Sequence, residues 1–369
     1  MKTYFSREPR QIYTERLVFM AALLIPAVFL MGVRVLLVCG LSVGFCMAAD
    51  YICCRLRRIK YDPNDACVPF WALGAAMLMP ASIPIFQIAV SSMIIVVLGK
   101  HIFGSSDNII FSPVAIAAAF LIVCYPAEML SYPKAGEHYP IFSYYAGALT
   151  RGLEYTMKLG LVPADTPFNI LLGNTAGAIG AVNILVIAVC GICLLIRRSN
   201  SISAVVSCII TAGVLAFAYP RVDCGGLMSV FYEFTSGYML FGVVFIFAEP
   251  YTLPKKLPSR ILYGIAMGYA MIMFRNFGQT EGSFIFALLI VNALGCCFDT
   301  LFDNLSYWQK TYVNSYEQNK TDVQHGNVKL TDTQEIVLPE KYRYNTPPIN
   351  SEIKYHRRRG RKENNDGKE

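Results

Sequence analysis

The sequence alternates between long apolar stretches and short polar connections. Ten apolar stretches have approximate bounds of 17–32, 35–54, 66–80, 84–102, 109–125, 177–196, 201–219, 227–248, 260–274 and 283–302. Recurring runs of this kind are typical of helices that cross about 30 Å of hydrocarbon. Several runs are short or interrupted, by Pro113, Gly237 and Gly242 among others. The pattern predicts an all-α membrane protein with about ten transmembrane helices.

Two polar interruptions of this pattern resemble each other across about 170 residues. Residues 100–111 and residues 275–286 each contain a base, then Phe-Gly, then an acid, then an apolar span. A proline-containing turn precedes each of them, at 79–84 and at 249–254. Internal repeats of this kind build many transport folds, and their binding sites lie where the halves meet. Five helices per copy is an odd number, so we expect two inverted five-helix repeats.

Composition and charge agree with a membrane location. The chain is 55% hydrophobic and 15% charged, whereas a soluble domain carries about 25% charged residues. The basic loop residues fall into three clusters on one side of the predicted bundle: Arg55, Arg57, Arg58 and Lys60, then Arg197 and Arg198, then Lys255, Lys256 and Arg260. Cytoplasmic loops carry such an excess. We therefore expect a multi-pass protein of a bacterial-type plasma membrane with both termini in the cytoplasm.

The same reasoning divides the chain into five parts. They are a cytoplasmic N-terminus (1–16), a first membrane repeat (17–125), an external loop (126–176), a second membrane repeat (177–305) and a polar cytoplasmic tail (306–369). The tail is poor in hydrophobic residues and is expected to be disordered. Its basic cluster, 357–362, fits a topology signal or, alternatively, contact with anionic lipid or a partner.

Cysteine and histidine give little sign of a metal site. Cys190 and Cys193 have metal or redox spacing, but no second pair follows, which favours packing over a redox or Fe–S role. Cys53 and Cys54 lie beside a basic loop and fit either palmitoylation or an inert pair. His101 ends an apolar stretch, which favours an interfacial residue over a proton relay. We predict no metal and no nucleic-acid partner, and no catalytic residue is identified.

Ionisable and glycine-rich positions inside the apolar stretches are the candidate functional features. Glu233 lies within a stretch, where ionisable residues are costly and often functional, and fits a cation or proton pathway or a structural pairing. Glu249 precedes Pro250 and is also compatible with a plain interfacial acid. Residues 171–180 combine glycines with the start of a helix, which fits an anion site or close helix packing.

Five stretches together resemble a known family: 78–84, 103–115, 172–180 (similar to L-G-N-x-x-G-S-I-G-E), 249–254 (similar to T-D-P-V-T-x-P) and 277–293. The family is the flavin-carrying membrane subunit of two respiratory pumps. It is the D subunit of the Rnf ferredoxin:NAD oxidoreductase and the B subunit of the sodium-translocating NADH:quinone oxidoreductase. Order and spacing match over about residues 15–305. Ala181 and Glu249 stand where the family has Glu and Asp, so the chain resembles a divergent member.

The resemblance implies an electron-transferring subunit that carries flavin. In the family, FMN is attached through its phosphate to a threonine of an S/T-G-A-T motif by a dedicated flavin transferase. A second flavin, for which riboflavin is a candidate, is held non-covalently among the helices. Here Leu149 stands at the acceptor position, and leucine has no hydroxyl. Thr150, one residue later, and Thr166 are the alternative acceptors, and no covalent flavin is the third possibility.

From the resemblance we expect a membrane subunit of an Rnf-like ion-translocating oxidoreductase complex, coupled to sodium or proton transport. The residues expected beside flavin are Asn108, Pro113, Gly173, Asn174, Glu249 and Thr252, and Glu233 is the candidate for ion coupling. Other membrane and peripheral subunits would carry the donor chemistry. The rival expectation is a non-redox transporter or scaffold that kept the fold and lost the flavin.

Overall fold

The computed structural model describes residues 8–102, 109–134, 136, 149–278 and 282–324. It separates into two compact units, of which the first is Met1–Trp308 and the second Gln309–Glu369. The described part of the second unit is helical, residues 309–324. The last helix, α15 (Ser283–Gln324), begins in the first unit and ends in the second.

The described residues of the first half of the chain form a set of apolar helices. They are α1 (Pro9–Ala22), α2 (Leu24–Met31), α3 (Arg34–Leu56), α4 (Cys67–Leu78), α5 (Ile85–Ile94), the π-helix η1 (Ile95–His101) and α6 (Pro113–Cys124). The first of these begins at Pro9, eight residues before the predicted span, and Ile12, Tyr13 and Arg16 are buried. Residues 9–16 therefore form part of a helix that packs into the protein.

The predicted external loop holds short helices in its described residues: α7 (Pro126–Met129), α8 (Leu153–Lys158) and α9 (Pro167–Leu172). An isolated antiparallel bridge joins Tyr132 to Thr150. The last short helix shows why the sequence folds this way locally. Thr166 caps its N-terminus, Pro167 opens its first turn, and Gly173 ends it in the left-handed region, at φ 86°.

The second half contains α10 (Ile184–Ile196), α11 (Ile202–Ala218), α12 (Gly226–Thr235), α13 (Met239–Phe241), the π-helix η3 (Gly242–Phe247), α14 (Leu257–Asn276) and α15 (Ser283–Gln324). The pair α12 and α13–η3 is bent by 68° at Gly237, whose φ is +61°. The bend confirms that this stretch is interrupted. The last helix continues well beyond residue 302, so the described part of the predicted polar tail is helical.

In the described part of the chain, four helices are long and apolar enough to cross a membrane: Arg10–Met31, Arg34–Leu56, Leu257–Asn276 and Ser283–Trp308. The bent pair raises this number to five, and five further apolar helices have 10–17 residues. Each of the ten predicted stretches contains helix. The structure thus confirms an all-helical protein with several membrane spans, and the count of ten crossings stays a prediction.

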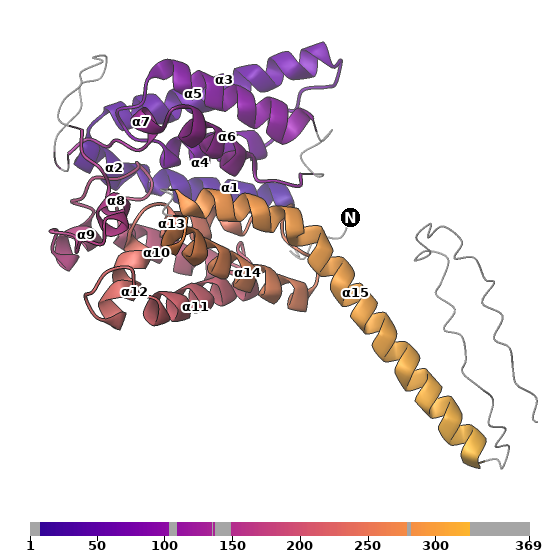
Figure 1. Cartoon of the computed structure of the whole chain (residues 1–369). Coiled ribbons are helices and arrows are strands. Elements are labelled where there is room, and N and C mark those ends of the chain that lie inside the picture. The colour runs from indigo at the N-terminus through magenta and orange to yellow at the C-terminus, as the bar shows by residue number, and fades with distance from the viewer. Residues whose placement is uncertain (1–7, 103–108, 135, 137–148, 279–281, 325–369) are drawn as a thin grey trace, which may run out of the picture. The chain divides into compact units, whose positions relative to one another are not determined.

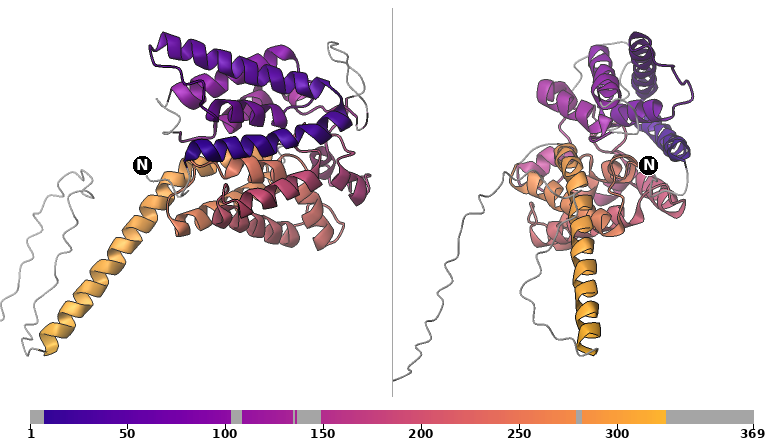
Figure 2. Two further views of the ribbon diagram at one scale, coloured as in Figure 1. Left: turned by 180° about the vertical axis from the view of Figure 1, so that it is seen from behind. Right: turned by 90° about the vertical axis from the view of Figure 1, so that its right-hand side faces the viewer.

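The helices of the two halves gather on two sides of the first unit, with α1 between them (Figure 1). Two further views show the same separation (Figure 2). Contacts of α1 to α4 on one side and to Ser199, Ala248 and Glu249 on the other account for this position. The boundary between the halves is therefore where buried polar groups from both can meet.

Candidate functional site at the boundary between the halves

Glu249 is a buried carboxylate at this boundary. It follows η3, is 1% exposed, and its Oε1 accepts hydrogen bonds from Tyr13 Oη at 3.0 Å and Trp71 Nε1 at 2.5 Å. Those donors come from α1 and α4, so the first half of the chain binds an acid of the second. Because a buried carboxylate is costly without donors, these two bonds are what allow it to lie here.

Arg16, one turn after Tyr13, brings a positive charge to the same region. Its side chain is fully buried and donates from Nη2 to the carbonyl oxygens of Ser199, at 2.9 Å, and of Ala248. Nε and Nη1 have no hydrogen-bond partner among the described residues, and unsatisfied buried donors cost about 1–3 kcal/mol or more. Two donors are thus available for a group that accepts hydrogen bonds.

Polar and aromatic side chains continue the cluster within the second half. Thr252 Oγ1 donates to the Glu249 carbonyl oxygen at 3.4 Å. Tyr263 donates to Asn292 Oδ1, while Asn292 Nδ2 has no partner in the described part of the chain. The Tyr263 ring stacks on Phe247 with centroids 5.1 Å apart. The Asn292 amide is therefore an unpaired donor close to a pair of stacked aromatic rings.

The other predicted flavin neighbours are distributed unevenly around this cluster. Pro113 opens α6 and lies against η1, since a Cβ added to Gly99 would come within 2.4 Å of Pro113 Cβ. Gly173 and Asn174 lie at the end of α9, in the predicted external loop, and their contacts among the described residues do not include Glu249. Asn108 lies outside the described residues. The structure therefore brings Glu249 and Thr252 together and leaves the full predicted set a proposal.

A second buried cluster surrounds Arg275 at the end of α14. Its Nη1 donates to Glu233 Oε2 at 2.7 Å, and Nε lies 3.5 Å from Glu154 Oε1. Arg221 Nε reaches the other oxygen of Glu233 at 2.5 Å. Nη2 of Arg275 donates to the Ser236 carbonyl oxygen at 2.9 Å. Both oxygens of Glu233 are thus held by arginines, which favours the structural pairing, and its role in ion coupling stays a prediction.

Gly237 makes this second cluster possible. It lies at the bend between α12 and α13, and a Cβ there would come within 2.1 Å of Glu154 Oε2. The close approach explains why a residue without a side chain stands at the bend. Glu154 comes from α8 in the predicted external loop, so the cluster connects that loop to the second half of the chain.

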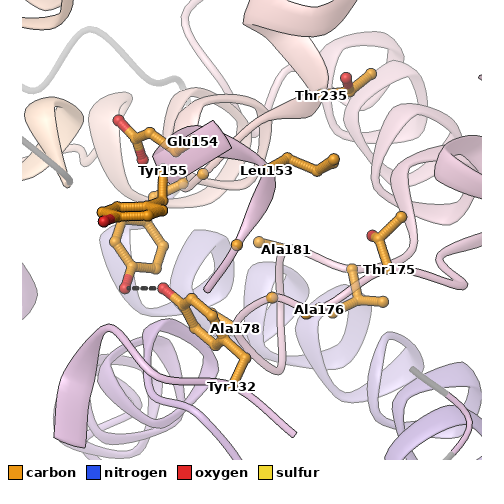
Figure 3. Close-up of a pocket in the computed structure, with 14 residues that line it drawn as sticks. Tyr132, Leu153, Glu154, Tyr155, Thr175, Ala176, Ala178, Ala181 and Thr235 are labelled. Atoms are coloured by element: carbon orange, nitrogen blue, oxygen red, sulfur yellow. Dashed lines mark hydrogen bonds between the residues drawn. The ribbon is translucent and has the colours of Figure 1, made fainter. Parts of the chain in front are cut away.

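A small pocket adjoins the Arg275 cluster (Figure 3). Its cavity volume is about 30 Å³, and its lining includes Tyr132, Glu154, Thr175, Thr235 and Tyr238. The two tyrosine hydroxyls lie 3.0 Å apart in a hydrogen bond, drawn dashed in the figure. The space suits one or two water molecules and lies far below the roughly 300 Å³ of a ligand pocket. A flavin does not fit this pocket as it stands.

The glycine-rich segment 173–180 packs closely against the helices. A Cβ on Gly173 would come within 2.8 Å of the Val182 carbonyl oxygen, and one on Gly180 within 2.7 Å of Met77 Cβ. The Gly180 amide donates to the Met77 carbonyl oxygen at 2.7 Å. These contacts explain the glycines by close packing, the second of the two interpretations of this segment.

The two alternative threonines have different surroundings. Thr150 is half-buried and pairs with Tyr132 through both backbone groups, at 2.8 and 2.9 Å, while its hydroxyl makes a long 3.5 Å bond to the Tyr132 carbonyl oxygen. Thr166 is exposed and its hydroxyl accepts the Asn169 amide at the start of α9. Leu149 is described and exposed; the residues just before it, 137–148, lie outside the described residues.

Sequence reasoning singled out Glu233 and Glu249 but missed most of their partners. Arg16, Tyr13 and Trp71 lie far from Glu249 in the sequence, and no spacing rule joins them. Glu154 lay in a segment treated as a loop. One signal was available, because Arg275 begins the second of the two similar polar stretches.

Comparisons with known proteins agree with the sequence pattern. The sequence model of the NQR2, RnfD, RnfE family matches residues 5–307. The D subunit of the ion-translocating oxidoreductase complex of Stutzerimonas stutzeri is 28% identical over 298 residues, covering 73% of this chain and 81% of that protein.

Two further relatives carry more specific names. The D subunit of the proton-translocating ferredoxin:NAD(+) oxidoreductase complex of Clostridium ljungdahlii is 22% identical over 286 residues, covering 72% of this chain and 82% of that protein. The B subunit of the Na(+)-translocating NADH-quinone reductase of Chromohalobacter salexigens is 25% identical over 235 residues, covering 62% and 56%. The match to the family model, over residues 5–307, includes both buried clusters.

Proposed function

Because the chain belongs to the NQR2, RnfD, RnfE family, we propose that it is a membrane subunit of an Rnf-like ion-translocating oxidoreductase complex. In this proposal it passes electrons through bound flavin while sodium or protons move across the membrane. The observation that carries the proposal is the match over residues 5–307, which takes in all the predicted membrane stretches. The relatives' names support the same kind of complex.

The proposed architecture is ten crossings in two inverted five-helix repeats. Matching contacts in the two halves support it. A Cβ on Gly74 of α4 would lie 3.3 Å from Val114, the second residue of α6, and one on Gly242 would lie 2.3 Å from Phe284, the second residue of α15. In both halves the third helix thus meets the start of the fifth. Helix pairs α3–α5 and α11–α14, second with fourth, also pack together.

The proposed flavin neighbours at the boundary are Glu249, Thr252 and Pro113, with Asn108, Gly173 and Asn174 carried over from the resemblance. When bound, a flavin supplies one- and two-electron chemistry. The chain's own residues would orient it and hold polar groups away from lipid. The unpaired Arg16 and Asn292 donors support a non-covalent flavin there, because each would gain an acceptor.

Partner subunits would supply the substrate chemistry. NADH, ferredoxin and Fe–S groups would bind on other subunits, and a flavin transferase would act on this chain only if a threonine accepts FMN. The expected location is a bacterial-type plasma membrane with both termini cytoplasmic. Residues 306–369 would form the cytoplasmic tail.

One observation favours a second candidate function. Leu149 occupies the position of the family's acceptor threonine, so covalent FMN needs another hydroxyl. A non-redox transporter or scaffold that kept the fold is the rival function.

Absorbance of the purified full chain separates the two functions. We expect the flavin absorbance spectrum in the native protein, and its loss to the soluble fraction on denaturation if the flavin is non-covalent. Fluorescence that stays with the chain on a denaturing gel would mean attachment, and the Thr150→Ala and Thr166→Ala variants would identify the residue. Purified protein and complex that both lack flavin would end the electron-carrier proposal and favour the rival.

A further inference from the structure

A cluster of three metal-ligating side chains lies where α3 meets η1, and it shares no residue with the two sites described above. Asp50 and Cys54 are one turn apart on α3, and His101 is the last residue of η1. One ligand atom from each lies within 4.8 Å of the others. Asp50 and Cys54 are 3% and 6% exposed, and the His101 side chain is 9% exposed. A buried carboxylate, thiol and imidazole thus converge on one point.

Helical geometry explains how the three side chains meet. Residues four apart lie on the same face of a helix, which aligns Asp50 with Cys54. The π-helix η1 continues α5 at the end of the fourth predicted stretch and turns His101 towards them. Such π-helical turns are frequent at functional sites. His101 is 47 residues from Cys54 in the sequence, so no spacing motif reveals the cluster. The sequence accordingly predicted no metal site.

The surrounding charges define the state of the cluster without an ion. His101 Nε2 lies 2.9 Å from Asp50 Oδ1, and Arg57 Nη1 lies 3.2 Å from His101 Nδ1. Since arginine can only donate, His101 Nδ1 accepts from Arg57, and the protonated Nε2 donates its hydrogen bond to Asp50 Oδ1. Arg57 also donates to the His101 carbonyl oxygen at 2.9 Å, a bond that does not depend on the ring.

Lys100 holds the second oxygen of Asp50 and leaves the first one to the cluster. Its Nζ lies 3.0 Å from Asp50 Oδ2 and 2.9 Å from Asp65 Oδ2. Burial alone would raise the pKa of Asp65, but the hydrogen bond and charge of Lys100 hold that pKa below its ordinary value. The two bases Lys100 and Arg57 balance the two acids Asp50 and Asp65, so binding of a divalent cation with loss of the Cys54 proton raises the net charge of the site by one.

We propose that Asp50 Oδ1, Cys54 Sγ and His101 Nε2 bind a divalent ion of the Zn²⁺ class, with a fourth position open to water. Bonds of about 2.0–2.3 Å to a tetrahedral ion place ligand atoms roughly 3.3–3.7 Å apart. The observed separations from Asp50 Oδ1, 2.9 Å to His101 and 4.0 Å to Cys54, lie on either side of that range. Small side-chain shifts in opposite directions would reach it.

Binding is balanced by the release of one proton. Cys54 loses its thiol proton to solvent, and His101 stays neutral by carrying its proton on Nδ1 instead of Nε2. With Nδ1 protonated, Arg57 gives up its hydrogen bond to the ring and keeps the one to the His101 carbonyl oxygen. Lys100 keeps Asp50 Oδ2 as a hydrogen-bond partner. Zn²⁺ has no redox chemistry, so the site is independent of the proposed electron path. The bound ion would join α3 to η1.

Cobalt is the probe, because Co²⁺ bound to a thiolate gives a charge-transfer absorbance band. The full chain, purified in detergent and stripped with a chelator, is titrated with Co²⁺ and then with Zn²⁺. We expect about one equivalent of Co²⁺ with the thiolate band, and its disappearance as Zn²⁺ replaces it. Asp50→Asn and His101→Ala should each weaken binding by about 100-fold or more, since even outer-shell changes cost 10–100-fold.

The matched control uses the neighbouring cysteine. Cys54→Ser should lose the thiolate band, whereas Cys53→Ser, one residue earlier on the same helix, should keep both the band and the affinity. Circular dichroism on each variant separates loss of binding from loss of fold, and His101→Ala decides if Cys54→Ser unfolds. Wild type without stoichiometric Co²⁺ binding, or a Cys54→Ser variant that keeps the thiolate band, would overturn the proposal.

Discussion

Arg275 shows how a buried charge is accommodated in this protein by pairing. Arg275 is 1% exposed and is held by Glu233, Glu154 and Ser236. A charge in low dielectric gains little net stability from a partner, but losing that partner leaves an uncompensated charge. The Arg275 cluster is therefore the position at which a single substitution should have the largest effect on folding.

Replacing Arg275 with alanine should lower the free energy of unfolding by about 3–5 kcal/mol. Two buried carboxylates, Glu233 and Glu154, would face each other with only Arg221 to compensate. The measurement is thermal or denaturant unfolding of the purified protein in detergent. The control is Arg197→Ala, because Arg197 is 53% exposed in its pair with Glu15, and exposed pairs contribute about 0–1 kcal/mol. Equal effects of the two substitutions would contradict this account.

For single residues, the sequence identified the buried acids but not the side chains that pair with them. Glu233 and Glu249 were visible because an acid within an apolar stretch is unusual. The donors to Glu249 are 178 and 236 residues away in the sequence, and only the folded chain brings them together. Leu149 shows the converse, since the loss of a hydroxyl is legible from sequence alone while its surroundings are not.

In the second half of the chain, α11 and α14 pack closely together at glycines of α14. On α14, a Cβ at Gly264 would come within 2.4 Å of the Ala204 carbonyl oxygen, and one at Gly268 within 2.7 Å of the Cys208 carbonyl oxygen. Both targets lie on α11. Small residues let membrane helices approach until their backbones touch. The two glycines thus set the distance between α11 and α14.

Gly268→Val should destabilise the protein by about 1–3 kcal/mol, as overpacking does, because the helices must separate. Gly44→Val on α3 is the matched control, since nothing lies within 4 Å of a Cβ there. Thermal unfolding in detergent measures both. If Gly44→Val cost as much as Gly268→Val, helix propensity and not the α11–α14 contact would explain the loss.

The positions of the helices were predicted from the sequence more successfully than the contacts between side chains. Apolar runs located helix in all ten stretches, and Gly237 marked the bend. The short helices α8 and α9 were missed because their hydrophobic signal covers six residues each. The π-helices η1 and η3 were missed too. A π-helical turn has one more residue than an α-helical turn, but the apolar run that contains it looks the same in the sequence.

Across the whole first unit, the number of membrane crossings has a clear experimental consequence. Four long helices and one bent pair would give five crossings, an odd number that places the two termini on opposite sides. Ten crossings place them on the same side. The shorter apolar helices, 10–17 residues each, decide between the two, since about 20 residues span a bilayer unless the helix lies beside a thinned or protein-filled region.

We expect epitope tags at both ends of the full chain to become accessible to antibody only after the cells are permeabilised. A tag inserted at Gly160, in an exposed turn of the external segment, should be accessible in intact cells. A tag at Asp62, in the exposed basic loop after α3, is the matched internal control and should behave like the two ends. Termini on opposite sides would leave five crossings and break the inverted pair of repeats. The family assignment would survive that result, because it depends on the sequence match and not on the parity of the helices.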